Sequence, residues 1–455
     1  MATINSAGLA MAHALGTSVI TASLYGVTSP GDVFTSVAPT FVVNTTADDL
    51  SFTAGKTNLR EAILAANAYP GHTVTFDPAV FATAKKITLT LGQLELSDAS
   101  GAETIKGPKA GVTVSGDNAS RVFEVDAGVT ASLSGLTVSG GSAVKGAGLY
   151  NLGTLTLAGC TVSGNSASVN GGGVYSRCTA TLTNCTVSGN SASVDGGGGM
   201  SQFGGTSTMT LTNCTVSGNS AAYGGGVFTN GGATTTLANC TVSGNSAGVG
   251  GGLDNSGALN ASNCTIGKNQ AVSEGGGIAT TSGSVTLTNV TVNKNQAISS
   301  AIAQGGAIYS ANTLVTLTNC TINANQATGS TAQGGGIYAY ECTVDMQNVA
   351  VNANEADGTI LAQGGGIYAY QTTVDMRNST VNGNQANGAT AQGGGIHAYQ
   401  TTVDMKNSTV NGNRADGTVL GQGGGIYGDS TTVLIFMNST VKGNKATTSG
   451  NDILL

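Results

Sequence analysis

The stretch 181–190 reads Thr-Leu-Thr-Asn-Cys-Thr-Val-Ser-Gly-Asn, and close variants of it recur along most of the 455-residue chain. The Asn that ends each copy falls at positions 165, 190, 219, 245, 269, 295, 325, 354, 384, 413 and 444. Successive copies are therefore about 28 residues apart, and a repeat of that length indicates a stack of equivalent structural units.

Within one copy the apolar side chains follow a period of two that is interrupted at corners. Cys185 and Val187 share one face, and Leu182 reaches that face only if the chain turns at Asn184. Short strands joined by Asn and Gly corners, where φ is positive, are typical of coils and not of hairpins. We therefore predict an all-β fold, a right-handed parallel β-helix of about 12–15 coils with a short N-terminal capping helix. A propeller blade needs about 40–45 residues, and a left-handed hexapeptide helix needs a shorter repeat, so both fit poorly.

The composition fits a repetitive β structure with a mostly neutral surface. The chain has 71 Gly, 5 Pro and no Trp, and only 9% of its residues are charged. A net charge of −7 and few Lys and Arg argue against nucleic acid as a partner. No apolar run reaches the roughly 18 residues of a transmembrane helix, so none is expected. The first charged residue is Asp32, and no export signal with a basic start is evident.

Three parts are expected along the chain. Residues 1–40 form a low-charge segment, residues 41–110 form an N-terminal cap with the first coils, and residues 111–455 form the β-helix repeats. The longer units near the C-terminus should extend one variable corner of the coil, because a solenoid absorbs insertions at its corners.

The cap contains one convincing helix, predicted over residues 57–68. Thr57 can serve as its N-cap, and Pro70-Gly71 follows its end. The face expected to pack on the first coil consists of Leu59, Ile63, Leu64 and Asn67. A helix at this position would cover an apolar first coil that otherwise leaves an open edge.

The sequence Leu59-Arg-Glu-Ala-Ile63, with Ala66-Asn67 and Pro70-Gly71 after it, resembles the Cys-Ser-Leu-Arg-Glu-Ala domain of bacterial surface β-helix proteins. Thr57-Asn58 stands here in place of Cys-Ser. The Gly-Gly-Gly-Ile-Tyr and Asn-x-Thr-x-x-x-Asn repeats resemble those of polymorphic outer-membrane and adhesin-like proteins. The resemblance implies an exported or surface location, and the anchor or translocator that many such proteins carry is not found in the sequence up to Leu455.

Stacked coils place equivalent residues in columns, and one column is rich in cysteine. It consists of Cys160, Cys185, Cys214, Cys240, Cys264, Val290, Cys320, Val349, Ser379, Ser408 and Ser439. Because Val and Ser also occur in this column, it requires a small side chain and not a thiol, and we predict free, buried cysteines. A metal site is not expected, since no His lies in register and no Cys-x-x-Cys occurs. Cys178 and Cys342 lie outside the column and could be exposed.

Three other columns have structural and functional interpretations. The corner Asn residues, such as Asn184 and Asn213, predict an amide ladder, and glycosylation of their sequons is the alternative. Outward Thr pairs flank an inward Leu at 181–183, 210–212, 286–288 and 316–318, which suits either an ordinary strand surface or an ice-binding array. The array is broken at Ala238 and Asn260-Ala261. Asp345, Asp375 and Asp404 are expected to pair with Arg377 and Lys406.

The aromatic residues of the C-terminal repeats form the candidate binding or assembly surface. They alternate with inward Ile and Ala, so an exposed stripe two residues wide is expected. The stripe consists of Tyr338, Tyr340, Tyr368, Tyr370, His397, Tyr399 and Tyr427, and one file is extended by Tyr150, Tyr175, Phe228 and Tyr309. Exposed contiguous rings mark contact surfaces for sugars or another subunit, while mutual stacking without a partner would explain the same pattern.

We interpret the chain as a non-enzymatic, extracellular or cell-surface structural or adhesive protein. The apolar end Ile453, Leu454 and Leu455 predicts an open coil edge that a second copy covers, giving a head-to-tail fibre. Residues 1–40 either cover that edge on a neighbour or fold back on their own chain. Surface glycans are a second possible partner, and no cofactor, metal-binding or catalytic residue is expected.

The alternatives are a carbohydrate-binding or polysaccharide-degrading β-helix and the ice-binding Thr array. Polysaccharide cleavage requires carboxylates that converge on the substrate. The acidic residues of this chain are scattered, and Asp195 and Glu274 lie at the variable corner of different repeats without a basic partner.

Overall fold

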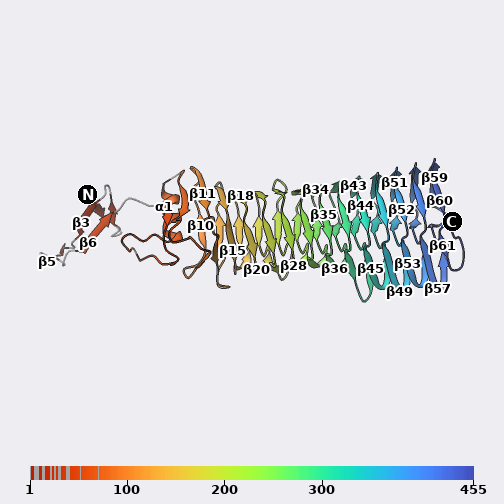
Figure 1. Ribbon diagram of the computed structural model, residues 1–455, viewed down its shortest axis with the longest axis horizontal. Coiled ribbons are helices and arrows are strands. Elements are labelled where there is room, and N and C mark those ends of the chain that lie inside the picture. Colours follow the sequence, from red (N-terminus) through yellow and green to blue (C-terminus); the bar gives the residue numbers. More distant parts are fainter. Residues whose placement is uncertain are drawn as a thin grey trace.

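The computed structural model describes residues 41–455 except Phe52 and Pro70, and it shows a long, straight stack of coils (Figure 1). Within residues 1–40 only the backbone of six strands is described. These are β1 (Ala2–Ile4), β2 (Ala10–Ala12), β3 (Gly16–Ile20), β4 (Ser23–Leu24), β5 (Val27–Thr28) and β6 (Asp32–Ser36), and β1 pairs with β2, β3 with β6 and β4 with β5, all antiparallel. The hypothesis that residues 1–40 cap a coil edge lies outside the described residues.

From residue 142 onward each coil contributes to four parallel sheets, and the earlier coils lack a strand in the fourth. In one coil these strands are β21 (Val174–Ser176), β22 (Thr179–Thr183), β23 (Thr186–Ser188) and β24 (Ser191–Ala192). We name the sheets that contain them the Tyr sheet, the Thr sheet, the Val sheet and the arm sheet, in that order. Every strand pairs with its equivalents one coil before and one coil after, so equivalent residues form columns.

The four sheets run nearly the full length of the rod. The Tyr sheet has 14 strands from β10 (Leu94–Leu96) to β62 (Ile453–Leu454), and the Thr sheet has 15 from β7 (Val42–Val43) to β59 (Val433–Met437). The Val sheet has 14 strands from β9 (Lys85–Thr88) to β60 (Thr440–Lys442), and the arm sheet has 13 between β16 (Ser142–Lys145) and β61 (Lys445–Ala446). The coil number predicted from the repeat is confirmed.

The corners use the residues that the sequence pattern predicts. Asn184 and its equivalents in later coils adopt φ near +54° between the Thr and Val sheets. Gly171 opens the Gly triplet with φ of +64°, and a Cβ on the third residue, Gly173, would lie 2.5 Å from the carbonyl oxygen of Gly199. The triplets therefore recur because adjacent coils approach too closely there for a side chain.

The interior is one continuous column of apolar side chains. In β22 the inward residues Ala180 and Leu182 are fully buried, as is Val187 of β23. Ala261, which we had expected to interrupt the outward Thr array, is in fact a core residue, and the outward residues of its coil are Asn260 and Ser262. The fold is thus specified by inward residues that repeat in every coil.

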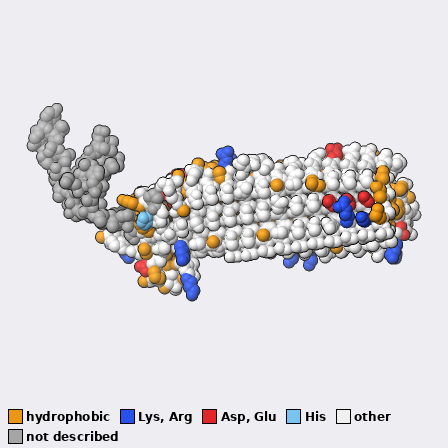
Figure 2. Space-filling model, turned by 90° about the horizontal axis from the view of Figure 1, so that it is seen from above, with side chains coloured by type: hydrophobic (Ala, Val, Ile, Leu, Met, Phe, Trp, Pro, Cys, Tyr) orange, Lys and Arg blue, Asp and Glu red, His pale blue; other side chains and the backbone are white. Residues whose placement is uncertain are grey.

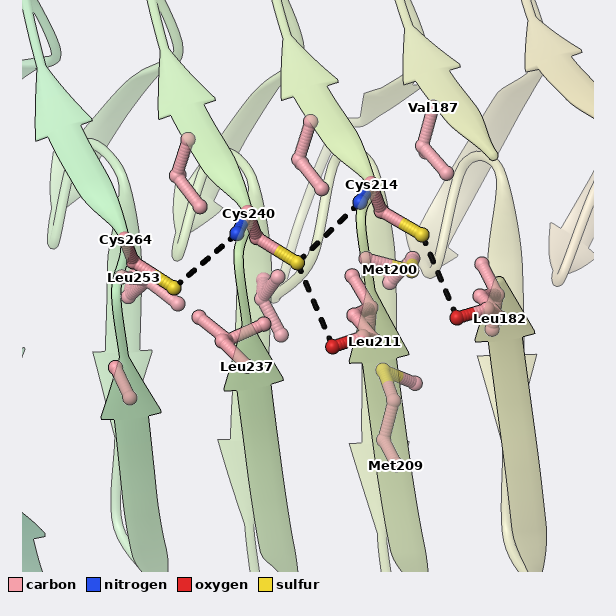
Figure 3. Close-up of a cluster of buried hydrophobic side chains, with 14 of the residues drawn as sticks. Leu182, Val187, Met200, Met209, Leu211, Cys214, Leu237, Cys240, Leu253 and Cys264 are labelled. Atoms are coloured by element: carbon pink, nitrogen blue, oxygen red, sulfur yellow. Dashed lines mark hydrogen bonds between the residues drawn. The ribbon is translucent and has the colours of Figure 1, made fainter. Parts of the chain in front are cut away.

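The cysteine column is buried and reduced, as predicted, and it also bonds along the axis (Figure 3). The amide of Cys214 donates to Sγ of Cys240 at 3.4 Å, and the amide of Cys240 donates to Sγ of Cys264 at 3.3 Å. Ser replaces Cys in later coils and makes the same contact: the amide of Ser379 donates to Oγ of Ser408 at 3.1 Å. All eight cysteines are free, with Cys178 exposed and Cys342 half-buried.

A buried asparagine ladder, which the sequence analysis did not predict, occupies the last Asn of each repeat. Nδ2 of Asn190 donates to Val162 O at 2.9 Å and to Oδ1 of Asn219 at 3.0 Å, while Oδ1 of Asn190 accepts from Nδ2 of Asn165. The ladder continues coil by coil to Asn444. The predicted corner ladder also exists but is exposed; for example, Asn213 donates to Asn184 at 3.2 Å.

Helix α1 (Leu59–Ala68) forms the predicted cap, with two corrections. Asn58, not Thr57, is the N-cap, because its side chain accepts from the amide of Glu61, whose carboxylate accepts from the amide of Asn58. The buried face consists of Leu59, Ala62, Ile63 and Ala66, whereas Leu64 is exposed. Ala62 and Ala66, and not Leu64, therefore lie on the side of the helix that contacts the strands of the first coils.

The long C-terminal repeats extend the arm sheet, as expected. Its strands there are β45 (Gln326–Gln333), β49 (Glu355–Gln363), β53 (Gln385–Gln392) and β57 (Arg414–Gln422). Buried alanines, two on each of β45, β49 and β53 and one on β57, contribute to a second, smaller core. The arm sheet projects from the rod and runs directly into the Gly triplets that precede the Tyr sheet.

Candidate functional site

The predicted aromatic stripe consists of two files on the Tyr sheet. The inner file, Tyr309, Tyr338, Tyr368, His397 and Tyr427, stacks with ring centroids 5.0–5.1 Å apart. These rings come from β42 (Ile308–Ala311), β46 (Ile337–Tyr340), β50 (Ile367–Tyr370), β54 (Ile396–Tyr399) and β58 (Ile426–Gly428). Our prediction of an exposed stripe is wrong for Tyr338, Tyr368 and His397, which are at most 8% exposed, whereas Tyr309 and Tyr427 are half-buried.

A glutamine ladder from the arm sheet lies against the inner file. Gln304, Gln333, Gln363, Gln392 and Gln422 join side chain to side chain at 2.8–3.2 Å. The polar atom of each covered ring contacts this ladder: Tyr338 bonds to Gln304, Tyr368 to Gln333, and Nε2 of His397 lies 3.0 Å from Nε2 of Gln363. Burial raises the pKa of Tyr368 to about 12 and lowers the pKa of His397 to about 3, so the imidazole is neutral.

The outer file is more accessible and consists of Tyr340, Tyr370 and Tyr399. Its centroids are 5.1 and 5.2 Å apart, and the ring planes are within 5° of parallel. Because each ring face contacts the next ring, these tyrosines present their edges to solvent. A sugar stacks on a ring face, so this file is poorly arranged for carbohydrate binding.

The inner file is interrupted in the middle of the rod. In the aromatic column Phe228 pairs with Asp254, Asp254 with Ala279, and Ala279 with Tyr309. The strands are β29 (Val227–Asn230), β33 (Leu253–Asn255) and β37 (Ile278–Thr280). In the glutamine column Glu274, at the end of β36 (Gln270–Glu274), takes the place before Gln304.

A cavity of about 290 Å³ occupies this interruption. Its walls are Asp195, Tyr223, Phe228, Asn230, Val249, Asp254, Ser256, Glu274 and Thr281. Asp195 and Glu274, which the sequence analysis treated as scattered, thus share one cavity with Asp254. Asp254 was not among the predicted site residues, although its alignment with Phe228 and Tyr309 in the aromatic column was a signal that could have identified it.

The charges of this cavity are unusual for a rod with so few ionisable groups. Asp254 is 6% exposed, and burial, with Glu274 and Asp195 nearby, raises its pKa to about 7. Burial also raises the pKa of Glu274. Asp195 accepts from Nδ2 of Asn170 at 3.1 Å. Across the described part of the chain, no three His, Cys, Asp or Glu side chains are placed to hold a metal ion.

The C-terminal end carries the second candidate surface (Figure 2). In β59 the inward residues Leu434 and Phe436 continue the core columns of Val403 and Met405. The outward residues Val433, Ile435 and Met437, which are 44–52% exposed, replace Thr402, Asp404 and Lys406 of the preceding coil. Of the predicted end residues, Ile453 and Leu454 are half-buried in β62 and Leu455 is exposed.

The remaining predicted surfaces lie where their columns place them. The outward Thr pairs are in register on the Thr sheet. Of the expected ion pairs, Asp375 pairs with Arg377, whereas among the described residues Asp345, Asp404 and Lys406 form none.

Comparison with known proteins supports the architecture. Residues 145–315 match the family described as the right-handed β-helix region. The chain is a right-handed parallel β-helix. No curated protein and no solved structure matches this β-helix. The part of the β-helix that matches contains the interrupted aromatic column but neither the cap nor the C-terminal end. Within the described residues, no helix of the β-helix is long and apolar enough to cross a membrane.

Proposed function

We propose that the protein is a non-enzymatic structural rod, extracellular or on a cell surface, that joins to further copies head to tail. The observation that carries this proposal is the apolar outward face of β59. In the two preceding coils the same outward positions hold Thr402, Asp404 and Lys406, and Thr373, Asp375 and Arg377.

The physical argument starts from exposed area. Val433, Ile435 and Met437 lie side by side on one strand, and fully burying such a side chain contributes about 1.5–3 kcal/mol. Among the described residues β59 and β60 are also the outermost strands of their sheets. An apolar strand at the edge of a sheet is the arrangement that favours addition of another strand.

The opposite end offers a different apolar surface, as head-to-tail assembly requires. Leu50, Leu64 and Leu91 are 49–65% exposed on the cap. A cavity of about 260 Å³ beside α1 includes Leu50, Leu64 and the carboxylate of Glu95. The two ends therefore both expose apolar side chains, but on different surfaces.

The rest of the rod is suited to stiffness. Ladders of Asn, Cys or Ser, Gln and aromatic side chains connect successive coils along the axis. The alternative of carbohydrate binding through the tyrosines is less well supported, because their ring faces contact one another. The ice-binding alternative is weakened by Ala238 and Asn260 in the Thr columns.

The test is a triple variant that restores the preceding coil's outward residues: Val433→Thr, Ile435→Asp and Met437→Lys. These residue types already occupy the same positions one coil earlier, so the strand should still form. Sedimentation velocity should show concentration-dependent assembly of the wild type and at least a tenfold weaker association of the variant. Ile360→Thr, which removes an exposed apolar side chain from the arm sheet, is the matched control.

Assembly of the triple variant at the wild-type concentration would contradict the proposal. Deleting residues 1–40 distinguishes the two roles suggested for that segment. Loss of assembly would indicate that the segment binds a neighbouring copy. Unchanged assembly would indicate that β59 and the cap make the end-to-end contact without it.

A further inference from the structure

We propose that the cavity between Asp254, Glu274 and Asp195 is a binding site for a small organic cation that carries a primary ammonium group. This site is independent of the assembly surface, since it lies in the middle of the rod.

The cavity lies where the aromatic column is interrupted and just before the glutamine ladder begins. An aromatic ring would fill the space beside Phe228, but the column supplies Asp254 and then Ala279. A glutamine would extend the ladder before Gln304, but the column supplies Glu274. Both changes remove packing or hydrogen bonding from the rod and add a carboxylate to the same hollow.

The carboxylate of Asp254 has an unmet requirement for a hydrogen-bond donor. It is 6% exposed, it lines the cavity, and no hydrogen bond from the described residues reaches it. Burying an ionised acceptor without a partner is costly, so a ligand that donates hydrogen bonds and carries positive charge would be strongly favoured there. The cavity walls contain no Lys, Arg or His that could take this role.

The form of the cavity favours an organic cation over an inorganic one. Its carboxylates do not converge on a point within metal-binding distance. Phe228 and Tyr223, whose centroids are 6.3 Å apart, add aromatic surface that attracts an ammonium group and packs on its carbon chain. A volume of about 290 Å³ is at the small end for ligand pockets.

Two classes of ligand, aliphatic diamines and amino sugars, share this chemistry. An aliphatic diamine would place one ammonium on Asp254 and extend along Phe228 and Val249. An amino sugar would place its ammonium in the same way and would use the hydroxyls of Ser256 and Thr281, which are 3.5 Å apart, for its own hydroxyls.

Binding should depend on pH. Asp254 faces Glu274 of β36, Asp195 of the preceding loop and Tyr223 of β28 (Ser220–Tyr223), and its pKa is raised to about 7. A cation requires the ionised form, so affinity should be higher at pH 8 than at pH 6, by up to about tenfold per pH unit below the pKa.

The experiment is isothermal titration calorimetry of the full chain with 1,4-diaminobutane and with glucosamine at pH 8. Asp254→Asn and Glu274→Gln should each weaken binding at least tenfold. Glu274→Gln keeps the fold, because Gln occupies the equivalent place in the following coils. The matched control is Glu341→Gln, an exposed position where Gln371 and Gln400 stand in the next two coils, and its affinity should equal that of the wild type.

The ligand that binds more tightly shows whether the site takes a diamine or an amino sugar. The proposal is overturned if neither amine binds the wild type, if the uncharged 1,4-butanediol binds as well as the diamine, or if Glu274→Gln binds with wild-type affinity.

Discussion

Asn190 shows how a single residue type fixes the coil. Its amide reaches the coil before and the coil after, and its burial leaves no water to replace those bonds. Both Asn columns were visible in the sequence, but the ladder was predicted only for the corner column. Periodicity shows that an Asn recurs in every repeat. The cost of losing its amide depends on burial, and burial depends on how the Gly triplets pack over the side chain.

We predict that Asn295→Ala lowers the free energy of unfolding by about 3 kcal/mol or more. The change removes the partner of Ile266 O and of the Asn269 side chain, and each unsatisfied buried group costs about 1–3 kcal/mol. Denaturant unfolding followed by circular dichroism measures this free energy of unfolding. Asn289→Gly, in the exposed ladder at a positive φ, should cost less than about 1 kcal/mol, and equal costs would refute the distinction.

His397 gives the rod an acid sensitivity that its tyrosine neighbours lack. In the unfolded chain it binds a proton near pH 6.5, but in the stack its pKa is lowered to about 3 by burial. The unfolded state therefore binds more protons between these values, and the free energy of unfolding falls as the pH decreases from about 6.5, by about 1.4 kcal/mol per unit.

The variant His397→Tyr isolates this contribution, because Tyr stands above and below it in the file. Between pH 7 and pH 5 the wild type should lose about 2 kcal/mol more stability than the variant. The raised pKa values of Asp254 and Glu103 act in the opposite direction but are common to both proteins. Identical pH profiles of the denaturation midpoint would show that the ring is not buried as described.

At the scale of elements, the cap depends on a buried ion pair that joins three segments. Arg60 of α1 donates to Asp48 at 2.7 Å and to the carbonyl of Gln93 at 2.8 Å, and Asp48 accepts from the amide of Thr90 at 2.6 Å. Burial raises the pKa of Asp48, but hydrogen bonds from Arg60, Thr90 and Leu91 outweigh this effect and hold the pKa below its usual value. The helix was predictable from its apolar spacing, but this ion pair was not, since its residues are far apart in the sequence.

We expect Asp48→Ala to destabilise the cap by about 3–5 kcal/mol, because Arg60 would remain buried without its counter-charge. Hydrogen exchange should show faster exchange in α1 and the first coils, with the C-terminal coils unchanged. Asp49→Ala, whose carboxylate bonds only to the nearby Ser51, is the control. Protection of α1 equal to that of the wild type would contradict the role of the ion pair.

At the scale of the whole molecule, the repeat predicted the sheets, the corners and the core, because each depends on residues within one or two coils. It did not predict that the arm sheet covers the inner aromatic file, since exposure there is decided by a neighbouring sheet. It also did not bring Asp195, Asp254 and Glu274 together, because the cavity depends on which rings are missing and not on which residues recur. The apolar outer face of β59 is visible once the repeats are aligned, because Val433–Met437 takes the place of Thr402–Lys406, but it was not predicted.

End-to-end assembly of this rod can be observed by negative-stain electron microscopy of the purified full chain over a range of concentrations. We expect unbranched filaments with the width of a single rod, whose length increases with concentration. Single rods of uniform length at every concentration would contradict this expectation.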